Sequence, residues 1–325
     1  MIVTRSPLRI SLGGGGTDLP SYYKKYGGFL IAAAINKYVY ISIAETFNKK
    51  FILKYSSLEE VKKINDIHHP LFRETLKKMN IKTPLNISSH ADIPSGTGLG
   101  SSGSFTVSLV SALAYLKNIK IKKNVLAETA CDIEIRKLNE PVGKQDQYVA
   151  TYGGLNSYNF QKNNKVSVKK IDISRDKLLK LNKNLIIFFS GYSRSSYTIL
   201  KKQNIETKKI NKSMIDNLHQ IKEFGILSLK YIQNNNFREF GKLMHEHWMY
   251  KKKRSKFITN NKIDTYYDYG IKNGALGGKL IGAGGGGFLM FYTEDPAFLE
   301  NRFSKIGLKK FDYQFDFEGS KLIAK

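Results

Sequence analysis

Residues 94–104, PSGTGLGSSGS, combine glycine and serine in a pattern suited to binding phosphate. Gly96, Gly98 and Gly100 alternate; glycine adopts conformations that other residues resist and lets a ligand approach the main chain. Apolar residues then recur at helical spacing, which predicts a helix over about 102–117. The first N–H groups of a helix are unpaired and carry positive partial charge. We therefore predict that this loop holds the phosphates of a nucleotide.

A carboxylate on the next predicted helix, over about 122–138, is the second chemical signal. Four helical neighbours of Glu134, at three-, four- or seven-residue spacing, are small or apolar, which places Glu134 on a buried stripe: Ala127, Ala130, Cys131 and Leu138. Asp132 has charged residues at four-residue spacing and is predicted to face solvent. A buried carboxylate needs a cation or strong hydrogen-bond donors. Two interpretations of Glu134 stay open: a metal ligand beneath the loop, or one half of a structural salt bridge.

The loop at residues 140–146, EPVGKQD, brings Lys144 and Asp146 close together. An acid beside a lysine can remove a proton from an alcohol while the lysine stabilises developing negative charge. A loop ion pair without a catalytic role explains the same two residues equally simply.

Other polar turns are weaker candidates for anion or ligand binding. A second glycine loop, GGGGTD, occupies residues 13–18, and a third, GAGGGG, occupies 282–287 between predicted strands. The turn at 190–196 carries Arg194 at an expected helix start, where it suits an anion or is an ordinary surface arginine. His245 and His247 do not share a helix face, so a metal pair is not predicted there.

Composition limits the possible classes of protein. The chain of 325 residues is 41% hydrophobic, and its net charge is +26, with lysines scattered along the sequence. Scattered lysines without a recognisable binding signature favour anionic small molecules over nucleic acid. One cysteine, an N-terminus without a signal-peptide core and no apolar run of membrane-span length predict a soluble, cytoplasmic protein.

The elements that must position these residues follow from the hydrophobic pattern. Pro7 in the first strand indicates an edge or a bulge. The segment 50–55 is interpreted as the hairpin partner of the strand before it, and a soft domain boundary falls near 175–182. Further strands are expected at 2–12, 38–43, 85–88, 155–160, 165–173, 185–189, 279–281, 288–292 and 311–317, and helices at 58–79, 197–273 and 296–306.

Several familiar nucleotide-binding patterns do not fit. Both glycine segments at 98–103 and 282–287 match GxGxxG, yet neither has the strand, helix and acid context of a dinucleotide fold. A Walker A motif and the protein-kinase HRD and DFG motifs are absent from the sequence.

Three ordered motifs instead resemble the GHMP kinases, a family of small-molecule kinases. They are PLRIS with GGGGTD near the N-terminus, PSGTGLGSSGS in the middle, and KLIGAGGGGF near the C-terminus. With GKQDQY, they are most similar to the sugar-phosphate branch of that family. The resemblance implies an α+β, two-domain fold: a ribosomal-protein-like N-terminal domain over residues 1–178 and a ferredoxin-like C-terminal domain over 179–325.

The resemblance also implies roles for individual residues. Asp146 matches the base that deprotonates the acceptor, with Arg9 and Lys144 beside it, and Glu134 matches a Mg²⁺ ligand together with Ser101 or Ser102. The loop residues that correspond to the ATP-binding loop are Pro94, Ser95, Gly96, Thr97, Gly98, Leu99, Gly100, Ser101 and Ser102. The residues expected to bind substrate are Gly15, Gly16, Thr17, Asp18, Arg194 and Gly285.

The implied reaction is ATP-dependent phosphorylation of the anomeric hydroxyl of D-glycero-D-manno-heptose 7-phosphate to the α-1,7-bisphosphate, for GDP-heptose and surface polysaccharide synthesis. A phosphate at the far end of the sugar needs a cationic pocket, for which Arg194 is the first candidate and Lys24, Lys25 and the 251–254 cluster are others. Alternatives are a fucokinase-like sugar 1-kinase and a non-catalytic ATP-binding regulator. The expected partners are ATP, Mg²⁺ and a sugar phosphate, without nucleic acid or membrane, in a monomer or homodimer.

Overall fold

A large mixed sheet forms the centre of the protein in the computed structural model, which describes residues 1–191 and 197–325. Its strand order is β11-β1-β2-β5-β3-β4, and β6 joins β2 and carries β7 on its other side. The strands are β1 (Ile2–Gly13), β2 (Gly28–Glu45), β3 (Phe51–Lys54), β4 (Leu58–Val61), β5 (Leu85–Ala91), β6 (Leu155–Phe160), β7 (Val166–Lys170) and β11 (Lys321–Ala324).

Strand β2 organises the sheet because it is long enough to pair with three neighbours. It runs antiparallel to β1, and on its other edge the first half pairs with β6 and the second half with β5. The register of β1 against β2 shifts between Pro7 and Leu8, so the predicted bulge at Pro7 is confirmed. Proline cannot donate to a strand ladder, and a bulge is one of the few places in a sheet that accept it.

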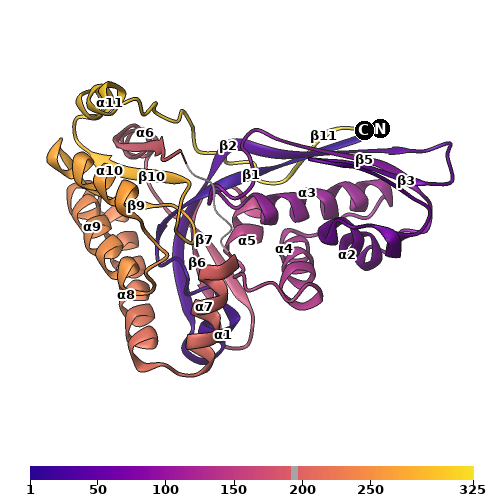
Figure 1. Cartoon of the computed structure of the whole chain (residues 1–325), viewed down its shortest axis with the longest axis horizontal. Coiled ribbons are helices and arrows are strands. Elements are labelled where there is room, and N and C mark those ends of the chain that lie inside the picture. Colours follow the sequence, from indigo (N-terminus) through magenta and orange to yellow (C-terminus); the bar gives the residue numbers. More distant parts are fainter. Residues whose placement is uncertain (192–196) are drawn as a thin grey trace.

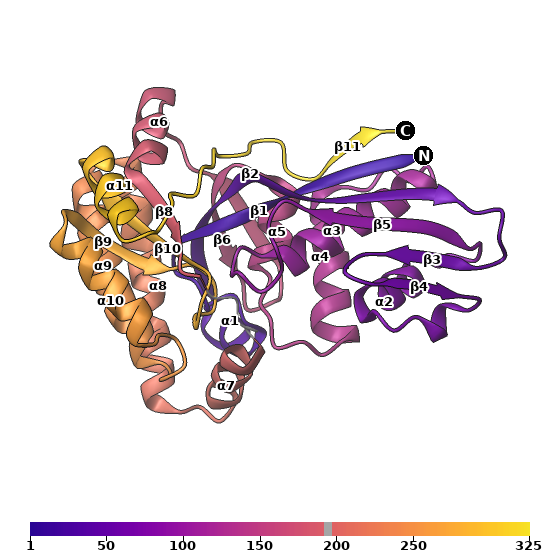
Figure 2. The same cartoon turned by 45° about the horizontal axis from the view of Figure 1, so that its top comes forward.

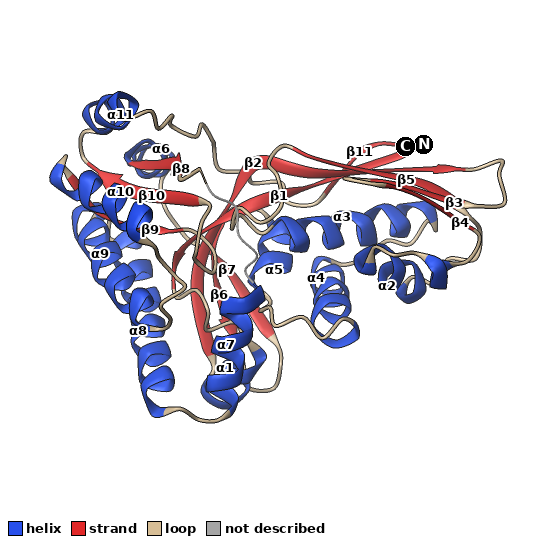
Figure 3. Cartoon of the chain, viewed as in Figure 1, coloured by secondary structure: helices blue, strands red, loops and turns tan. Residues whose placement is uncertain are grey.

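Helices cover one face of this sheet, as Figures 1 and 3 show. The central helix, α3 (Ser101–Leu116), is buried on nearly every side, which explains its small and apolar sequence. Ser104 ties it to β1 by donating a hydrogen bond from Oγ to the carbonyl oxygen of Pro7, at 2.7 Å. The surrounding elements are α2 (Pro70–Lys78), α4 (Lys123–Cys131), a π-helical turn (Asp132–Lys137) and α5 (Gln145–Tyr152).

A smaller antiparallel sheet, β8-β10-β9, lies in the second half of the chain. Helix α8 (Lys212–Gln233) packs against α9 (Phe237–Lys253) and also contacts β1 and β2, so the two halves share a core. The confirmed class is therefore α+β. The other elements of this half are α6 (Arg175–Asn184), β8 (Leu185–Phe189), α7 (Tyr197–Lys208), α10 (Asn261–Lys272), β9 (Ala275–Leu280), β10 (Phe288–Thr293) and α11 (Pro296–Lys305).

Three local predictions are wrong. Segment 50–55 contributes β3, which pairs with β4 and β5 instead of β2, because β5 and β6 occupy that edge of β2. Segment 58–79 holds β4 and a short 3₁₀ turn (Ile64–Asp66) before α2 begins. Near 311–317 only isolated bridges form.

The last strand of the chain is β11, which crosses back to pair with β1, as Figure 2 shows. The expected domain division between residues 178 and 179 falls inside α6. A search of the described helices finds none that is long and apolar enough to cross a membrane.

Candidate active site

A cavity of about 880 Å³ opens where the large sheet meets the second half of the chain. One wall comes from β1, the loop after it and the loop before α3; the other comes from α9, β9 and the third glycine segment. Arg9, Asp18, Gly100, Asp146 and Lys279 are among the residues that line it. The cavity thus collects predicted site residues that are far apart in the sequence.

The phosphate loop reaches α3 through three glycines with left-handed backbone angles. The φ angles of Gly96, Gly98 and Gly100 are 79°, 86° and 81°, a region that costs other residues energy. Gly100 is the N-cap of α3, and no side chain caps the helix start. The free N–H groups at this end therefore lie at the cavity wall, available to an anion.

The third glycine segment packs against the phosphate loop, main chain to main chain. A Cβ at Gly287 would lie 2.0 Å from the carbonyl oxygen of Thr97, and one at Gly98 would lie 2.7 Å from that of Ile281. Gly285 donates its N–H to the carbonyl oxygen of Ile258 at 2.8 Å, so this donor is already used inside the protein. Close packing explains the glycines here, while their neighbours in the segment line the cavity.

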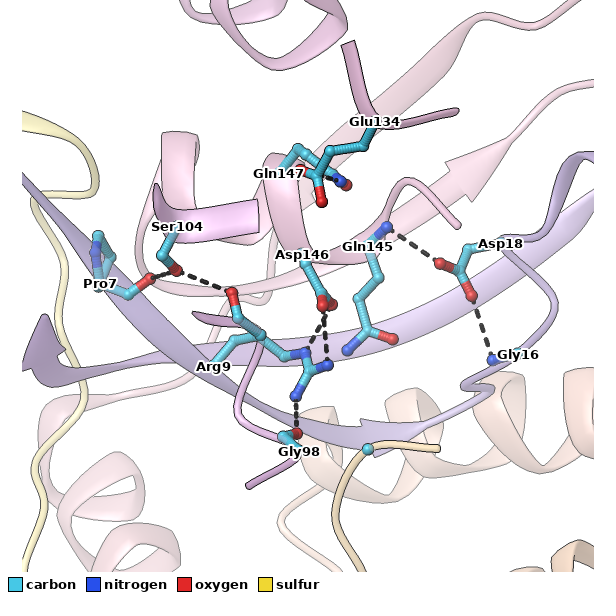
Figure 4. A network of polar contacts seen from close by, with 12 residues as sticks. Pro7, Arg9, Gly16, Asp18, Gly98, Ser104, Glu134, Gln145, Asp146 and Gln147 are labelled. Atoms are coloured by element: carbon cyan, nitrogen blue, oxygen red, sulfur yellow. Dashed lines mark hydrogen bonds and ion pairs between the residues drawn. The ribbon is translucent and has the colours of Figure 1, made fainter. Parts of the chain in front are cut away.

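Arg9 on β1 holds Asp146 at the start of α5 in a two-point contact (Figure 4). Arg9 Nε lies 2.8 Å from Asp146 Oδ1, and Nη2 lies 3.1 Å from Oδ2. The same guanidinium donates to the carbonyl oxygen of Gly98 through Nη1, which links the acid to the phosphate loop. A Cβ at Gly103 would lie 2.6 Å from Asp146 Cβ, so a larger residue there would displace the acid from the first turn of α3.

Glu134 lies in the π-helical turn after α4 and is 2% exposed. Gln147 Nε2 donates to its Oε1 at 2.8 Å. Burial raises the pKa of the Glu134 carboxyl to about 7; the hydrogen bonds from Gln147 and Ser102 lower the pKa, and the charge of Asp146 raises it further. Figure 4 shows the Glu134 carboxylate beside Gln147 and the Asp146 carboxylate directed toward Arg9.

This arrangement fits a bound magnesium ion. Mg²⁺ takes oxygen ligands, typically one or two carboxylates together with substrate phosphates. Glu134 supplies a buried carboxylate, Ser102 a hydroxyl within hydrogen-bonding reach of that carboxylate, and Gln147 Oε1 is a buried oxygen without a partner. A cation there would also offset the repulsion between Glu134 and Asp146. Ser101 and Ser102 both line the cavity.

Asp132 was predicted to face solvent, and this is wrong. It is 7% exposed, with a 2.7 Å contact to Lys78 of α2 and a second ion pair with Arg136. The prediction assumed regular α-helical spacing, but the chain widens into a π-helical turn at Asp132. Helix α2 then covers the face that was expected to be free.

Asp18 occupies the floor of the cavity below the second glycine loop. Its carboxylate accepts hydrogen bonds from the backbone N–H groups of Gln145, at 3.0 Å, and Gly16, at 3.2 Å. Burial and the nearby Asp146 charge raise the pKa of Asp18, although these hydrogen bonds oppose the shift. Gly143 is required beside it, since a Cβ there would lie 1.9 Å from Asp18 Oδ2.

The geometry does not place the Lys144 ammonium beside Asp146. Lys144 Nζ lies 2.6 Å from Glu128 Oε1 and donates to the carbonyl oxygen of Asn164 at 2.9 Å. The side chain is 3% exposed and does not line the cavity. Lys144 is the N-cap of α5; its side chain reaches Glu128 of α4, whereas Asp146 reaches Arg9 at the cavity. Arg9 takes the position next to the acid that was expected of Lys144.

The other expected site residues divide into three groups. Arg194 lies outside the described residues. Some side chains have structural contacts: Thr17 donates to the carbonyl oxygens of Gly14 and Phe29, and Thr97 donates to that of Pro94. Leu99 is buried. The remaining expected residues that line the cavity are Gly15, Gly16, Ser95, Gly96, Gly98 and Gly100.

The sequence prediction missed one part of the cavity and named only some residues of another. An aromatic part is lined by Tyr55, His69 and Phe105, whose segments are far apart and carry no common pattern. A basic part is lined by Lys279 on β9 and by residues of α9 and its C-terminal end. The run at 251–254 had been named as a weaker candidate for the sugar phosphate, whereas Lys279 was not, although KLIGAGGGGF places this lysine inside an apolar strand.

Comparison with known proteins gives consistent matches over the whole chain. The model of the GHMP kinases N terminal domain matches residues 66–154, and that of the GHMP kinases C terminal matches 228–307. D-glycero-alpha-D-manno-heptose 7-phosphate kinase of Campylobacter jejuni is 30% identical over 90% of this chain and 89% of that protein.

Two solved structures are similar throughout their length. A D-glycero-D-manno-heptose 1-phosphate kinase from Bacteroides thetaiotaomicron has a TM-score of 0.82 at 23% identity, covering 100% of this chain and 99% of that one. A putative sugar kinase from Campylobacter jejuni has a TM-score of 0.76 at 28% identity, covering 99% and 98%.

Proposed function

The chain belongs to the GHMP kinases, and on this premise we propose that it transfers the γ-phosphoryl group of ATP to D-glycero-D-manno-heptose 7-phosphate. The acceptor is the anomeric hydroxyl and the product is the α-1,7-bisphosphate, which serves GDP-heptose and surface polysaccharide synthesis. The 30% identical relative supports this sugar. The observation that carries the kinase activity is the Arg9–Asp146 pair, linked through Gly98 to the phosphate loop.

The loop before α3 and the aromatic part of the cavity together suit ATP. Backbone N–H groups of residues 96–102 bind the phosphates, assisted by the positive end of α3. The adenine base packs among Tyr55, His69 and Phe105, whose rings lie 4.6–5.4 Å apart between centroids in successive pairs. Both parts line the same cavity, so one extended nucleotide can occupy them together.

Asp146 acts as the base that takes the proton from the sugar hydroxyl as its oxygen attacks the γ-phosphorus in line. Arg9 orients the carboxylate of Asp146 by its two-point contact. Because the same guanidinium contacts the Gly98 carbonyl, the base keeps a fixed position relative to the loop. Positioning of this kind accounts for much of the catalysis of phosphoryl transfer. Asp18 accepts hydrogen bonds from sugar hydroxyls at the cavity floor.

Glu134 and one of Ser101 and Ser102 would hold Mg²⁺ at the loop. When bound, the ion neutralises charge on the phosphate oxygens. Glu134 itself is kept in place by Gln147, whose amide donates to the carboxylate from the neighbouring turn of α5.

A panel of sugars and sugar phosphates with ATP, combined with NMR of the product anomer, tests the proposal. Heptose 7-phosphate should be the best acceptor and give the α-anomer. Turnover of free fucose instead would favour a fucokinase-like enzyme, and ATP binding without any turnover would favour a regulator.

The Asp146→Asn variant tests the base in the same assay. We expect kcat to fall by roughly 10²- to 10⁴-fold while the affinity for ATP stays within about threefold. Asp312→Asn is the control, because Asp312 is 85% exposed at the surface. Near-normal kcat in Asp146→Asn would exclude Asp146 as the base.

A further inference from the structure

Three cations and one imidazole form a basic cluster on the cavity wall made by α9 and β9, beside the third glycine segment that packs against the phosphate loop. The cluster consists of Lys279 on β9, Lys251 and His247 on α9, and Arg254 directly after α9. Lys279 is 3% exposed and Lys251 7% exposed, and all four side chains line the cavity. Burying a charge is unfavourable unless the charge is paired, so this cluster needs an explanation.

The protein itself gives these cations few partners. Among the described residues, Lys279 Nζ has no hydrogen bond or ion pair, and Lys251 Nζ donates only to the carbonyl oxygens of Leu280 and Gly282. Arg254 donates to Gln203 Oε1 at 3.1 Å, while its buried Nε has no partner. None of the three forms an ion pair with a described carboxylate; their charges instead repel one another.

Neighbouring groups define which ligand can reach the cluster. Arg254 lies against the second glycine loop, since a Cβ at Gly16 would be 2.5 Å from Arg254 Nη1. Gln203 joins the two by donating from Nε2 to the carbonyl oxygen of Gly16 at 2.9 Å. Asp18 lies near Arg254, and its negative charge opposes the lowering of the pKa of Arg254 that burial causes. The cluster therefore borders the part of the cavity assigned to the sugar.

We propose that the basic cluster binds the phosphate monoester at the end of the sugar remote from the reacting hydroxyl. This inference rests on the proposed function, in which Asp146 meets the reacting hydroxyl and Asp18 the ring hydroxyls. A dianionic phosphate accepts several charge-assisted hydrogen bonds at once, which matches Lys279, Lys251 and the free Nε of Arg254. Neutral His247, whose pKa burial and the neighbouring cations lower, can donate one more.

The phosphates of ATP are the competing source of the same chemistry. They already have the free N–H groups at the start of α3 and in the glycine loop. The aromatic part that suits adenine is lined by residues of α3 and of the segment between β3 and α2. The basic cluster comes from α9, its C-terminal end and β9. The sugar phosphate is therefore the better match, and the two assignments predict different kinetics.

The test compares steady-state kinetics of Lys279→Met and Arg254→Met with those of wild type and a control, Lys242→Met. Lys242 lies on the same helix α9 but is 51% exposed and pairs with Glu239. We expect KM for heptose 7-phosphate to rise roughly 10- to 100-fold in both cluster variants, as for loss of a charge-assisted hydrogen bond. KM for ATP should stay within about threefold in all variants. A raised KM for ATP with an unchanged KM for the sugar phosphate would overturn the proposal.

A second measurement separates this inference from the proposed reaction. Inorganic phosphate should raise the melting temperature of wild type and of Lys242→Met, and much less that of Lys279→Met. This result supports the anion site even if heptose 7-phosphate is not turned over. If wild type turns over heptose 7-phosphate while both cluster variants keep its KM, the reaction stands and the assignment of the basic cluster is wrong.

Discussion

Replacing Lys279 by methionine should stabilise the ligand-free protein. The ammonium is almost fully buried and lies among cations: Arg9 on β1, Arg254 after α9, and Lys251 beside His247 on α9. Burial lowers the pKa of Lys279 from 10.5 to about 7, and repulsion by the charges of Arg254 and Arg9 contributes to this shift. Methionine retains most of the apolar stem without the charge.

The size of the effect follows from the lowering of this pKa. A change from 10.5 to about 7, at 1.36 kcal/mol for each pH unit, corresponds to about 5 kcal/mol. Local relaxation and water entry reduce this value, so we expect a gain in the free energy of unfolding on the order of 2–4 kcal/mol. The gain should be largest at pH 6, where both folded and unfolded chains keep the lysine protonated.

The lowered pKa of Lys279 determines whether wild-type stability rises or falls with pH. Between about pH 7 and 10.5 the folded protein has released the proton of Lys279 while the unfolded chain still binds it. Wild-type stability therefore rises with pH over this window, and the advantage of Lys279→Met shrinks towards zero. The pKa of Lys251 is also lowered well below 10.5 by burial and the neighbouring cations, so its titration adds to the rise in the wild type over this window. The lowered pKa values of His247 and Arg254 act outside it, below about pH 6.5 and above about pH 10.

Urea unfolding at pH 6 and pH 9.5, without phosphate or nucleotide, measures these differences. The exposed-lysine variant Lys242→Met serves as the control and should change stability by less than about 0.5 kcal/mol. A Lys279→Met protein that is less stable than wild type at pH 6 would refute the reasoning. So would a difference that is the same at both pH values.

Three further variants test the site. Glu134→Gln should require a higher Mg²⁺ concentration for half-maximal rate and lose at least about 100-fold in kcat, while exposed Glu300→Gln changes neither in the same titration. Gly287→Ala should raise KM for ATP and lower stability by roughly 2–4 kcal/mol, because the new Cβ meets the phosphate loop; Gly307→Ala has a similar φ without any contact and should cost only about 1 kcal/mol in urea unfolding. Lys144→Met should lose roughly 1–3 kcal/mol in urea unfolding, since the variant loses the ion pair between the buried ammonium and the partly exposed Glu128, and unchanged stability would contradict that role.

Local chemistry explains why much of the site could be predicted from the sequence. The phosphate loop is contiguous, and its glycines adopt the positive φ angles that such a turn needs. The buried position of Glu134 followed from small residues at helical spacing, a pattern that survives the π-helical turn. Strand β8 was predicted within its bounds because a short apolar run ends at turn residues, and β6 because Gly153-Gly154 and the turn at Asn163-Asn164 delimit it.

The sequence predictions that were wrong concern contacts between segments far apart in the sequence. Lys144 and Asp146 are neighbours in sequence, yet the start of α5 turns their side chains in different directions, and Glu128 binds the lysine. Strand β3 pairs with β5 and not with β2, because β5 and β6 together occupy the edge of β2 that faces away from β1. Asp132 faces Lys78 only because α2 packs over the π-helical turn. Spacing within one segment contains no information about these partners.

The basic cluster shows why such a site is hard to detect in the sequence and easy to understand in the fold. Lys279 on β9 is far in sequence from His247, Lys251 and Arg254 on and after α9, and the run at 251–254 also holds Lys252 and Lys253, so charge alone does not show which residues share the site. In the fold, Lys279 differs from surface lysines because it is buried without a partner among the described residues. The repulsion that lowers stability in the free protein is relieved when an anion binds, so the same charges that weaken folding strengthen ligand binding. A stabilising substitution at Lys279 and a weakened affinity for phosphate should therefore occur together, and a variant that gained the first without the second would separate burial from function.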